Sequence, residues 1–128
     1  MGQEYLIDSN VIINYLAGNI SVSKVDLLKS IVNAKPQISV ISQIEVLSRD
    51  STEAYTALIE GFLSECHVRT LSSEVVQLTI AIRRKYKLKT PDAIIAATAI
   101  HYNSTLITSN IRDFDNIKGL KLLNPTEN

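Results

Sequence analysis

Short segments rich in β-branched residues alternate with segments of helical periodicity along the whole chain. Strands are expected at residues 4–7, 37–40, 66–69, 105–108 and 121–123. Between them, apolar residues recur three or four positions apart, which predicts helices that begin near residues 11, 22, 42, 52, 72, 90 and 110. Because strands alternate with helices throughout, we expect an α/β sandwich with a parallel sheet at its core.

Polar residues mark the expected starts of several helices. Ser42 is expected to open the helix that carries Glu45, at the spacing of a capping box. Either Ser72 or Ser73 is expected to cap the helix that runs to about residue 86, and Asn110 to cap the last short helix.

The bulk composition bounds the class of protein. With 128 residues, of which 45% are hydrophobic, the chain suits a single domain spanning residues 1–128. A single cysteine, Cys66, excludes an intramolecular disulfide and fits a reducing compartment. The formal net charge is zero, so a nucleic-acid surface must be local. No apolar run reaches membrane-spanning length and the start does not resemble a signal peptide, so we expect a soluble, cytoplasmic protein with no membrane partner.

Four acidic residues lie where an expected strand gives way to a helix: Asp8, Glu45, Asp92 and Asp113. In a parallel α/β protein the carboxyl ends of the strands face one crevice, where ligands bind. Acids that converge there repel each other unless a cation joins them. Carboxylate oxygens are ligands that Mg²⁺ or Mn²⁺ prefers, so the arrangement predicts a divalent-metal site and phosphodiester chemistry.

Each acid taken alone also has a structural explanation. Asp8 is placed to cap the helix that follows it, and Asp92 lies in a first helical turn, where the helix dipole favours negative charge. Glu45 and Asp113 each follow a candidate cap residue by three positions. However, Asp8, Glu45 and Asp92 are flanked by apolar residues, where a carboxylate loses hydration and needs compensation. We therefore favour a joint metal site over four separate caps.

Other catalytic chemistries find little support in the sequence. His67 and His101 lack the spacing of a zinc pair, and one cysteine does not make a thiolate site. The sequence holds no nucleophile elbow, Walker loop or dinucleotide-binding glycine pattern. Cys66 and His67 are neighbours in an expected strand, so their side chains point to opposite faces and we expect only packing or surface roles.

A basic segment precedes Asp92. Its cationic residues are Arg83, Arg84, Lys85, Lys87 and Lys89, and Tyr86 lies among them. Residues 83–87 are expected to attract a phosphate backbone through counterion release, with Tyr86 available for base stacking. The alternative is a helix C-terminus whose dipole favours cations, and both explanations stay open.

Four stretches carry a resemblance to a known family. They are Leu-Ile-Asp8-Ser9-Asn10-Val-Ile-Ile, Ser42-Gln-Ile-Glu45, Asp92-Ala-Ile-Ile-Ala-Ala-Thr98-Ala and Leu-Ile-Thr108-Ser-Asn110-Ile-Arg-Asp113-Phe114. Together they resemble the PIN-domain nucleases, in particular the small VapC-like toxins of prokaryotic type II toxin–antitoxin pairs. The resemblance spans nearly the whole chain, and the stretch around Asp92 is its most specific part.

The resemblance implies a fold, an activity and partners. The implied fold is a PIN-like three-layer sandwich with a central parallel sheet of about five strands flanked by helices. The implied activity is that of an endoribonuclease dependent on Mg²⁺ or Mn²⁺, which cleaves RNA by hydroxide attack on a phosphodiester. Such proteins usually work as homodimers, and a cognate antitoxin protein silences them.

The resemblance also assigns roles to residues of this chain. It places Asp8, Glu45, Asp92 and Asp113 in catalysis and metal binding, with Asp115 as the reserve for the fourth acid. Residues expected to orient these carboxylates are Ser9, Asn10, Thr108 and Asn110.

Other classes of protein stay open as alternatives. One is a PIN-like RNA-binding or structural module without catalysis, but the retention of all four acids argues against it. Another is a nuclease of the same family that is not a toxin. A phosphotransfer receiver is disfavoured, because receivers place two acids together near the first strand and Asp8 has no acidic neighbour.

Overall fold

The computed structural model describes residues 4–125 and contains a five-stranded parallel sheet. The strands are β1 (Tyr5–Ile7), β2 (Gln37–Ser39), β3 (His67–Arg69), β4 (Thr105–Ile107) and β5 (Lys121–Leu123). The helices are α1 (Ser9–Leu16), α2 (Val22–Asn33), α3 (Val40–Leu47), α4 (Glu53–Ser64), α5 (Ser73–Lys85), α6 (Thr90–His101) and α7 (Ile111–Phe114). The prediction of a sandwich around about five parallel strands is confirmed.

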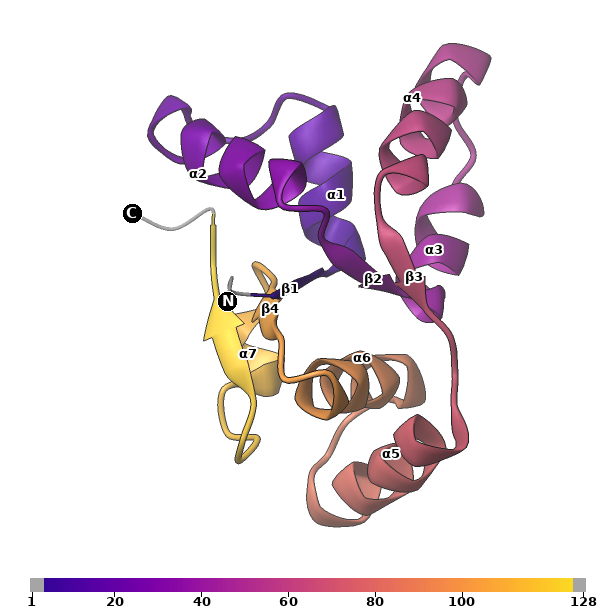
Figure 1. Cartoon of the computed structure of the whole chain (residues 1–128), viewed down its shortest axis with the longest axis vertical. Helices are drawn as coiled ribbons and strands as arrows, with labels where there is room; N and C mark the ends of the chain where they lie inside the picture. Colours follow the sequence, from indigo (N-terminus) through magenta and orange to yellow (C-terminus); the bar gives the residue numbers. More distant parts are fainter. Residues whose placement is uncertain (1–3, 126–128) are drawn as a thin grey trace.

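Two hydrophobic clusters enclose the sheet, one on each face. Leu6 and Leu106 contribute to the cluster of α5 and α6, whereas the next residues along their strands, Ile7 and Ile107, contribute to the cluster of α1 to α4. Figure 1 shows these two groups of helices on opposite sides of the sheet. Covering both faces explains why β2 and β4 are buried at every position.

The strand order is β3-β2-β1-β4-β5, so β1 lies at the centre. The chain first builds outward from β1 through β2 to β3 and then returns to add β4 and β5 on the other side. The direction of growth therefore reverses between β1 and β4. In open α/β sheets, ligands bind outside the carboxyl ends of the strands at such a switch point.

One helix start differs from the sequence prediction. Helix α3 begins at Val40, because the hydroxyl of Ser39 accepts a hydrogen bond from Ile41 N at 3.1 Å and caps the helix there. Ser42 lies inside the helix, and its buried hydroxyl has no hydrogen-bond partner within the described chain. The expectations that Ser42 opens this helix and forms a capping box with Glu45 are therefore wrong.

The structure also resolves the other two expected caps. Ser72 caps α5, since its hydroxyl accepts a hydrogen bond from Val75 N at 3.2 Å, whereas the hydroxyl of Ser73 faces Glu74. Asn110 occupies the cap position of α7, but its side chain makes no capping hydrogen bond. The side chain of Asn110 is therefore available for another contact, described below.

Helix length bears on the expectation that no segment crosses a membrane. The longest helix in the described chain, α5, has 13 residues. Among residues 4–125, no helix combines the length and the apolar character that a membrane crossing requires.

We expect Ser72→Ala to lower the free energy of unfolding by about 1 kcal/mol, because the N–H of Val75 loses its acceptor. Ser73→Ala, one position further along the chain, is the matched control. It should change the free energy of unfolding little, since alanine is a good helix former. Urea unfolding followed by circular dichroism measures both. A larger loss in the control would place the cap at Ser73 instead.

Candidate functional site

Asp8 lies directly after β1 and is the most enclosed of the four acids, with 6% of its surface exposed. Its Oδ1 accepts a hydrogen bond from Ser9 N at 2.8 Å, so Asp8 caps α1 as predicted. Its Oδ2 accepts hydrogen bonds from Thr108 Oγ1 at 2.9 Å and from Asn10 Nδ2 at 3.4 Å. A cap needs only the first of these contacts; the other two fix the orientation of the whole carboxylate.

The segment after β4 meets Asp8 across the switch point. The backbone N–H of Asp8 donates to the last carbonyl of β4 at 2.9 Å. Thr108 Oγ1, which donates to Asp8, also accepts a hydrogen bond from Asn110 N at 3.0 Å. Ser109 N donates to Asn10 Oδ1 at 3.4 Å. Backbone and side chains of the β4 end therefore hold the β1 end in place.

Glu45 reaches the same region from α3, which follows β2 without a connecting loop. Its side chain is exposed, and its Oε1 accepts a hydrogen bond from Ser9 Oγ at 3.0 Å. Ser9 thus contacts two of the acids, Asp8 through its N–H and Glu45 through its hydroxyl. This contact joins the start of α1 to α3.

The remaining acids come from α6 and α7. Asp92 is half-buried in the first turn of α6, as predicted, where the helix dipole favours a carboxylate. Helix α6 follows α5 with no strand between them, so the expectation that a strand gives way to a helix at Asp92 is wrong. Asp113 is exposed on α7, and its Oδ2 accepts a hydrogen bond from Asn110 Nδ2 at 2.8 Å. Asp115, the reserve for the fourth acid, follows as the C-cap of α7 and is exposed.

The environment of Asp8 disfavours its charged form. Burial raises the pKa of Asp8 above its ordinary value of 3.8, and the hydrogen bonds from Thr108 and Ser9 act against this rise. The charges of Glu45 and Asp92 raise the pKa further. Three of the predicted acids therefore repel one another across the gap between α1, α3 and α6.

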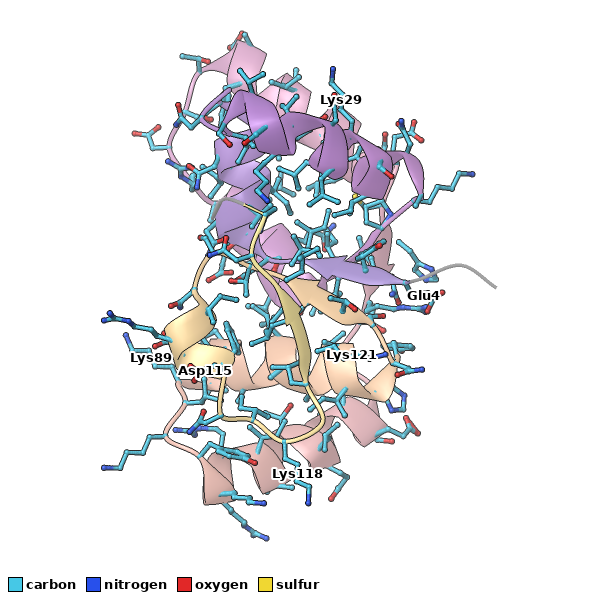
Figure 2. The ribbon with its side chains drawn as sticks, turned by 90° about the vertical axis from the view of Figure 1, so that its left-hand side faces the viewer. Glu4, Lys29, Lys89, Asp115, Lys118 and Lys121 are labelled. Carbon is cyan, nitrogen blue, oxygen red and sulfur yellow. The ribbon has the colours of Figure 1, made fainter. Side chains whose placement is uncertain are left out.

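Asp92 links this group to the fourth acid. Burial is the largest cause of its raised pKa, and the charges of Asp113 and Glu45 come next. Lys89, the residue just before α6, acts in the opposite direction. Of the two candidates for the fourth acid, only Asp113 contributes to the shift at Asp92, although Figure 2 shows Asp115 on the same side of the molecule as Lys89.

The donor chemistry of these four carboxylates fits a hard divalent cation. All their ligand atoms are oxygens, as Mg²⁺ and Mn²⁺ prefer, and a cation would offset the burial and the repulsion that raise the pKa values of Asp8 and Asp92. Within residues 4–125, however, no three or more His, Cys, Asp or Glu side chains are arranged so that they could hold one ion. Closer approach requires rotation of Glu45 and Asp113, whose side chains are exposed.

The basic segment lies at the end of α5, just before α6. Arg84, Lys85 and Lys87 are exposed, whereas Arg83, also exposed, donates from Nε to the carbonyl of Leu88 at 3.2 Å. The placement at a helix C-terminus agrees with the dipole explanation and leaves the charges open to solvent. Lys89 was not among the residues assigned to RNA, although its position next to the helix of Asp92 was a usable signal.

Tyr86 is less available for base stacking than the sequence suggests. Its ring is half-buried against the cluster of α5 and α6, and its hydroxyl accepts a hydrogen bond from Lys118 N at 3.0 Å. Lys85 Nζ lies 5.5 Å from the centre of the ring. These contacts give Tyr86 a packing role, and base stacking on its half-buried ring stays a prediction.

Strand β3 begins at His67, so the expectation that Cys66 lies in the same strand is wrong, although the two residues do differ in burial. Cys66 packs with the cluster of α1 to α4, and burial raises the pKa of its thiol to about 11. His67 is exposed. A thiol with so high a pKa is a poor nucleophile and metal ligand near neutral pH.

Comparisons with known proteins agree with this fold. A family model for the PIN domain matches residues 5–120. Among curated proteins, none matches the sequence. A chain of a toxin–antitoxin complex from Klebsiella pneumoniae is 30% identical, with a TM-score of 0.78 and coverage of 98% of this chain and 100% of that one.

Two further solved structures share the fold. A chain of VapBC2 from Rickettsia felis, bound to a DNA fragment from its promoter, is 23% identical with a TM-score of 0.81, and 95% of this chain and 98% of that chain are covered. A chain of VapBC-1 from nontypeable Haemophilus influenzae is 21% identical with a TM-score of 0.81, and the covered shares are 98% and 100%.

Asp8→Asn should make the metal-free protein more stable near pH 7, and this advantage should shrink as the pH falls towards about 4. The folded state raises the pKa of Asp8, so the fold favours the protonated form of this side chain. The stability that this preference gives to the wild type is fully present below the ordinary pKa of 3.8 and is lost as the pH rises through the folded-state pKa. Asparagine removes the charge and still caps a helix.

Melting temperatures measured in EDTA across this pH range test the prediction. Asp26→Asn, which removes an exposed acid on α2, is the control and should show no such convergence with the wild type. A constant difference between Asp8→Asn and wild type at every pH would contradict the assigned electrostatics.

Proposed function

The chain belongs to the PIN domain family, and from that premise we propose that it is a metal-dependent endoribonuclease. We propose further that residues 1–128 act as one nuclease domain, as a homodimer in the cytoplasm, and that the protein is the toxin of a type II toxin–antitoxin pair. One observation carries the catalytic part: at the switch point of the sheet, Asp8 interacts electrostatically with Glu45 of α3 and Asp92 of α6, and Asp92 does so with Asp113 of α7. A crevice of this kind suits a divalent cation and a phosphodiester.

Asp8, Glu45, Asp92 and Asp113 would hold the ion. A bound Mg²⁺ or Mn²⁺ supplies Lewis-acid stabilisation of phosphate charge and makes hydroxide available near neutral pH. The chain's own contribution is to orient these carboxylates. Asp8 is fixed by three donors, whereas Glu45 and Asp113 each accept one side-chain hydrogen bond and keep room to adjust.

Four polar residues would position these acids. Ser9 donates hydrogen bonds to both Asp8 and Glu45. Asn10 and Thr108 donate to Asp8, and Asn110 donates to Asp113. These four donors are the residues expected from the sequence. Hydrogen bonds from such neighbours fix the rotamer of a metal ligand and stabilise its charged form. The contacts support the proposed roles of all four.

RNA would approach over the basic segment. Arg83, Arg84, Lys85 and Lys87 are exposed and precede the helix that carries Asp92, and a phosphate backbone passing them would release counterions. Lys89 lies nearer still to the acids. Tyr86 lies among these residues, and we propose that its half-buried ring stacks with a base.

Exposed apolar side chains support the proposed protein partners. Ile44 and Leu47 are exposed on α3 and Leu58 on α4, and the exposed Leu71 and Ile80 lie at or near α5. An antitoxin and a second copy of the chain are the partners proposed for such surfaces. The Klebsiella pneumoniae relative is a chain of a toxin–antitoxin complex, which supports the first of them.

Purified protein should cleave single-stranded RNA in Mg²⁺ or Mn²⁺ and stop in EDTA. Asp92→Asn should reduce cleavage by at least about 100-fold, because a metal-site carboxylate is lost while the amide keeps a similar shape. Gel analysis of a labelled RNA measures the rate. Undiminished wild-type cleavage in EDTA would exclude the metal-dependent mechanism.

The same variants separate the toxin from its alternatives. Expression of the wild type in a bacterial host should arrest growth, and Glu45→Gln at a matched protein level should relieve the arrest. Cleavage without growth arrest would favour a nuclease of the family that is not a toxin. RNA binding without cleavage would favour the non-catalytic module.

Mg²⁺ should raise the melting temperature through binding to the native state, and Asp113→Asn should remove more of this rise than Asp115→Asn. Asp113 is the acid that acts on Asp92 and that Asn110 holds. Thermal melts with and without Mg²⁺ measure the difference for each variant. If Asp115→Asn removed more of the rise and more of the cleavage, the two residues would exchange roles.

A further inference from the structure

Buried polar side chains hold the guanidinium of Arg69 at the end of α6 that lies away from Asp92. Gln37 and Ser104 are 4% and 2% exposed, and Gln37 Nε2 donates to Ser104 Oγ at 2.6 Å. Arg69 Nε donates to the remaining acceptor of that amide, Gln37 Oε1. Gln37 is thereby satisfied at both ends, and the Nε side of the guanidinium is fixed.

An aromatic ring fixes the same guanidinium from one face. Arg69 Cζ lies 3.9 Å from the centre of the Tyr102 ring, the geometry of a stacked cation–π contact. Tyr102 packs against the cluster of α5 and α6, and the ring of His101 meets it edge-on at 4.7 Å between centroids. Arg69 is therefore preorganised, so little side-chain freedom remains to be lost when a ligand binds.

Most of the hydrogen-bonding capacity of Arg69 is left over. A guanidinium has five N–H donors, of which Nε serves Gln37 and Nη1 faces His67 Nε2 at 3.3 Å. Within residues 4–125 no other hydrogen-bond partner contacts this guanidinium. An oriented guanidinium with a free edge matches the paired oxygens of a phosphate.

The surroundings of Arg69 are polar and of mixed charge. His67 is exposed and also lines a hollow of about 430 Å³, whose other lining residues include Lys35 and Glu65. Lys35 and Arg69 are cationic, and Glu65 and Glu4 are the carboxylates at this end of the sheet. No carboxylate is among the hydrogen-bond partners of the Arg69 guanidinium in the described chain, so its own positive charge favours an anion at the free edge.

The distance from the acids suits an extended strand of nucleic acid. Helix α6 has 12 residues and so is roughly 18 Å long, with Asp92 in its first turn and Tyr102 at its C-cap. Figure 2 shows the corresponding separation, with Lys89 on one side of the molecule and Glu4, at the start of β1, on the other. Single-stranded sites commonly span four or more nucleotides, so one RNA can reach both ends.

We propose that Arg69, with His67 and Tyr102, forms a second phosphate-binding site, which anchors the RNA away from the cleavage centre. The competing explanation is purely structural: Arg69 only satisfies Gln37 and closes the end of the sheet. The proposal rests on the proposed function in one respect, namely that the anion belongs to RNA. It predicts a contact that does not depend on base sequence.

Binding without cleavage tests the site. The Asp8→Asn protein is titrated in EDTA with a fluorescent single-stranded RNA of about ten nucleotides, at several salt concentrations. Adding Arg69→Gln should weaken binding about tenfold and reduce the slope of log K against log salt by about 0.7, the value for one lost phosphate contact on a single strand. Lys29→Gln, which removes an exposed charge on α2 (Figure 2), is the charge-matched control and should leave the slope unchanged.

A second measurement uses the intact side chain and so does not depend on how well a variant folds. The Nε–H resonance of Arg69 in the Asp8→Asn protein should shift as the RNA is added. An unshifted resonance at saturating RNA, or equal binding by the Arg69→Gln and Lys29→Gln proteins, overturns the proposal.

The two proposals fail in different ways. RNA binding through Arg69 by a protein that does not cleave RNA in Mg²⁺ or Mn²⁺ supports the anchor site and overturns the proposed function. Metal-dependent cleavage with no response at Arg69 overturns the anchor site and leaves the proposed function standing. A lower melting temperature of Arg69→Gln with unchanged RNA affinity assigns Arg69 to closing the sheet.

Discussion

Repulsion among carboxylates at the carboxyl end of the sheet is the constraint on which the rest of this structure depends. Asp8 is buried between α1 and the segment after β4, where a charge without partners would be costly. Thr108, Ser9 and Asn10 lower that cost with hydrogen bonds, but the pKa of Asp8 still lies above its ordinary value. The fold thus keeps an unfavourable arrangement of charge at its switch point, as functional sites commonly do.

The site has a rigid half and an adjustable half. Asp8 belongs to the rigid half, because strand ends and three donors define its position. Glu45 and Asp113 belong to the adjustable half, because each is exposed and held by one neighbouring side chain. Such a division explains how four acids lie within electrostatic range of each other without forming a closed ligand set in the described chain.

The sequence predicted features that depend on neighbouring residues better than features that depend on distant ones. The strand before Asp8 could be predicted because both faces of the sheet are covered, so the strand is a run of apolar residues that ends at Asp8. The cap of α3 was misplaced because Ser39 and Ser42 are both suitable cap residues, and only the end of β2 distinguishes them.

Distant partners explain what the sequence left hidden. Tyr86 is held by Lys118, 32 positions away, so its packing role had no local signal. Arg69 meets Gln37 across 32 positions, and Gln37 meets Ser104 across 67. The pairing of Asn110 with Asp113 was legible, in contrast, because three positions on a short helix bring the side chains together.

Hydrogen bonds hold every residue of the segment between β4 and α7. Thr108, Ser109 and Asn110 are consecutive, and each makes a hydrogen bond that ties the segment to Asp8 or Asn10 or to itself. Homologous chains should therefore vary in length at the turn between α1 and α2, whose residues 17–21 are mostly exposed, and not between residues 107 and 111. One inserted residue there would shift a hydroxyl by about 3 Å and leave the buried acid unsupported. Across evolution, the length of this connection is as much a part of the site as the acids themselves.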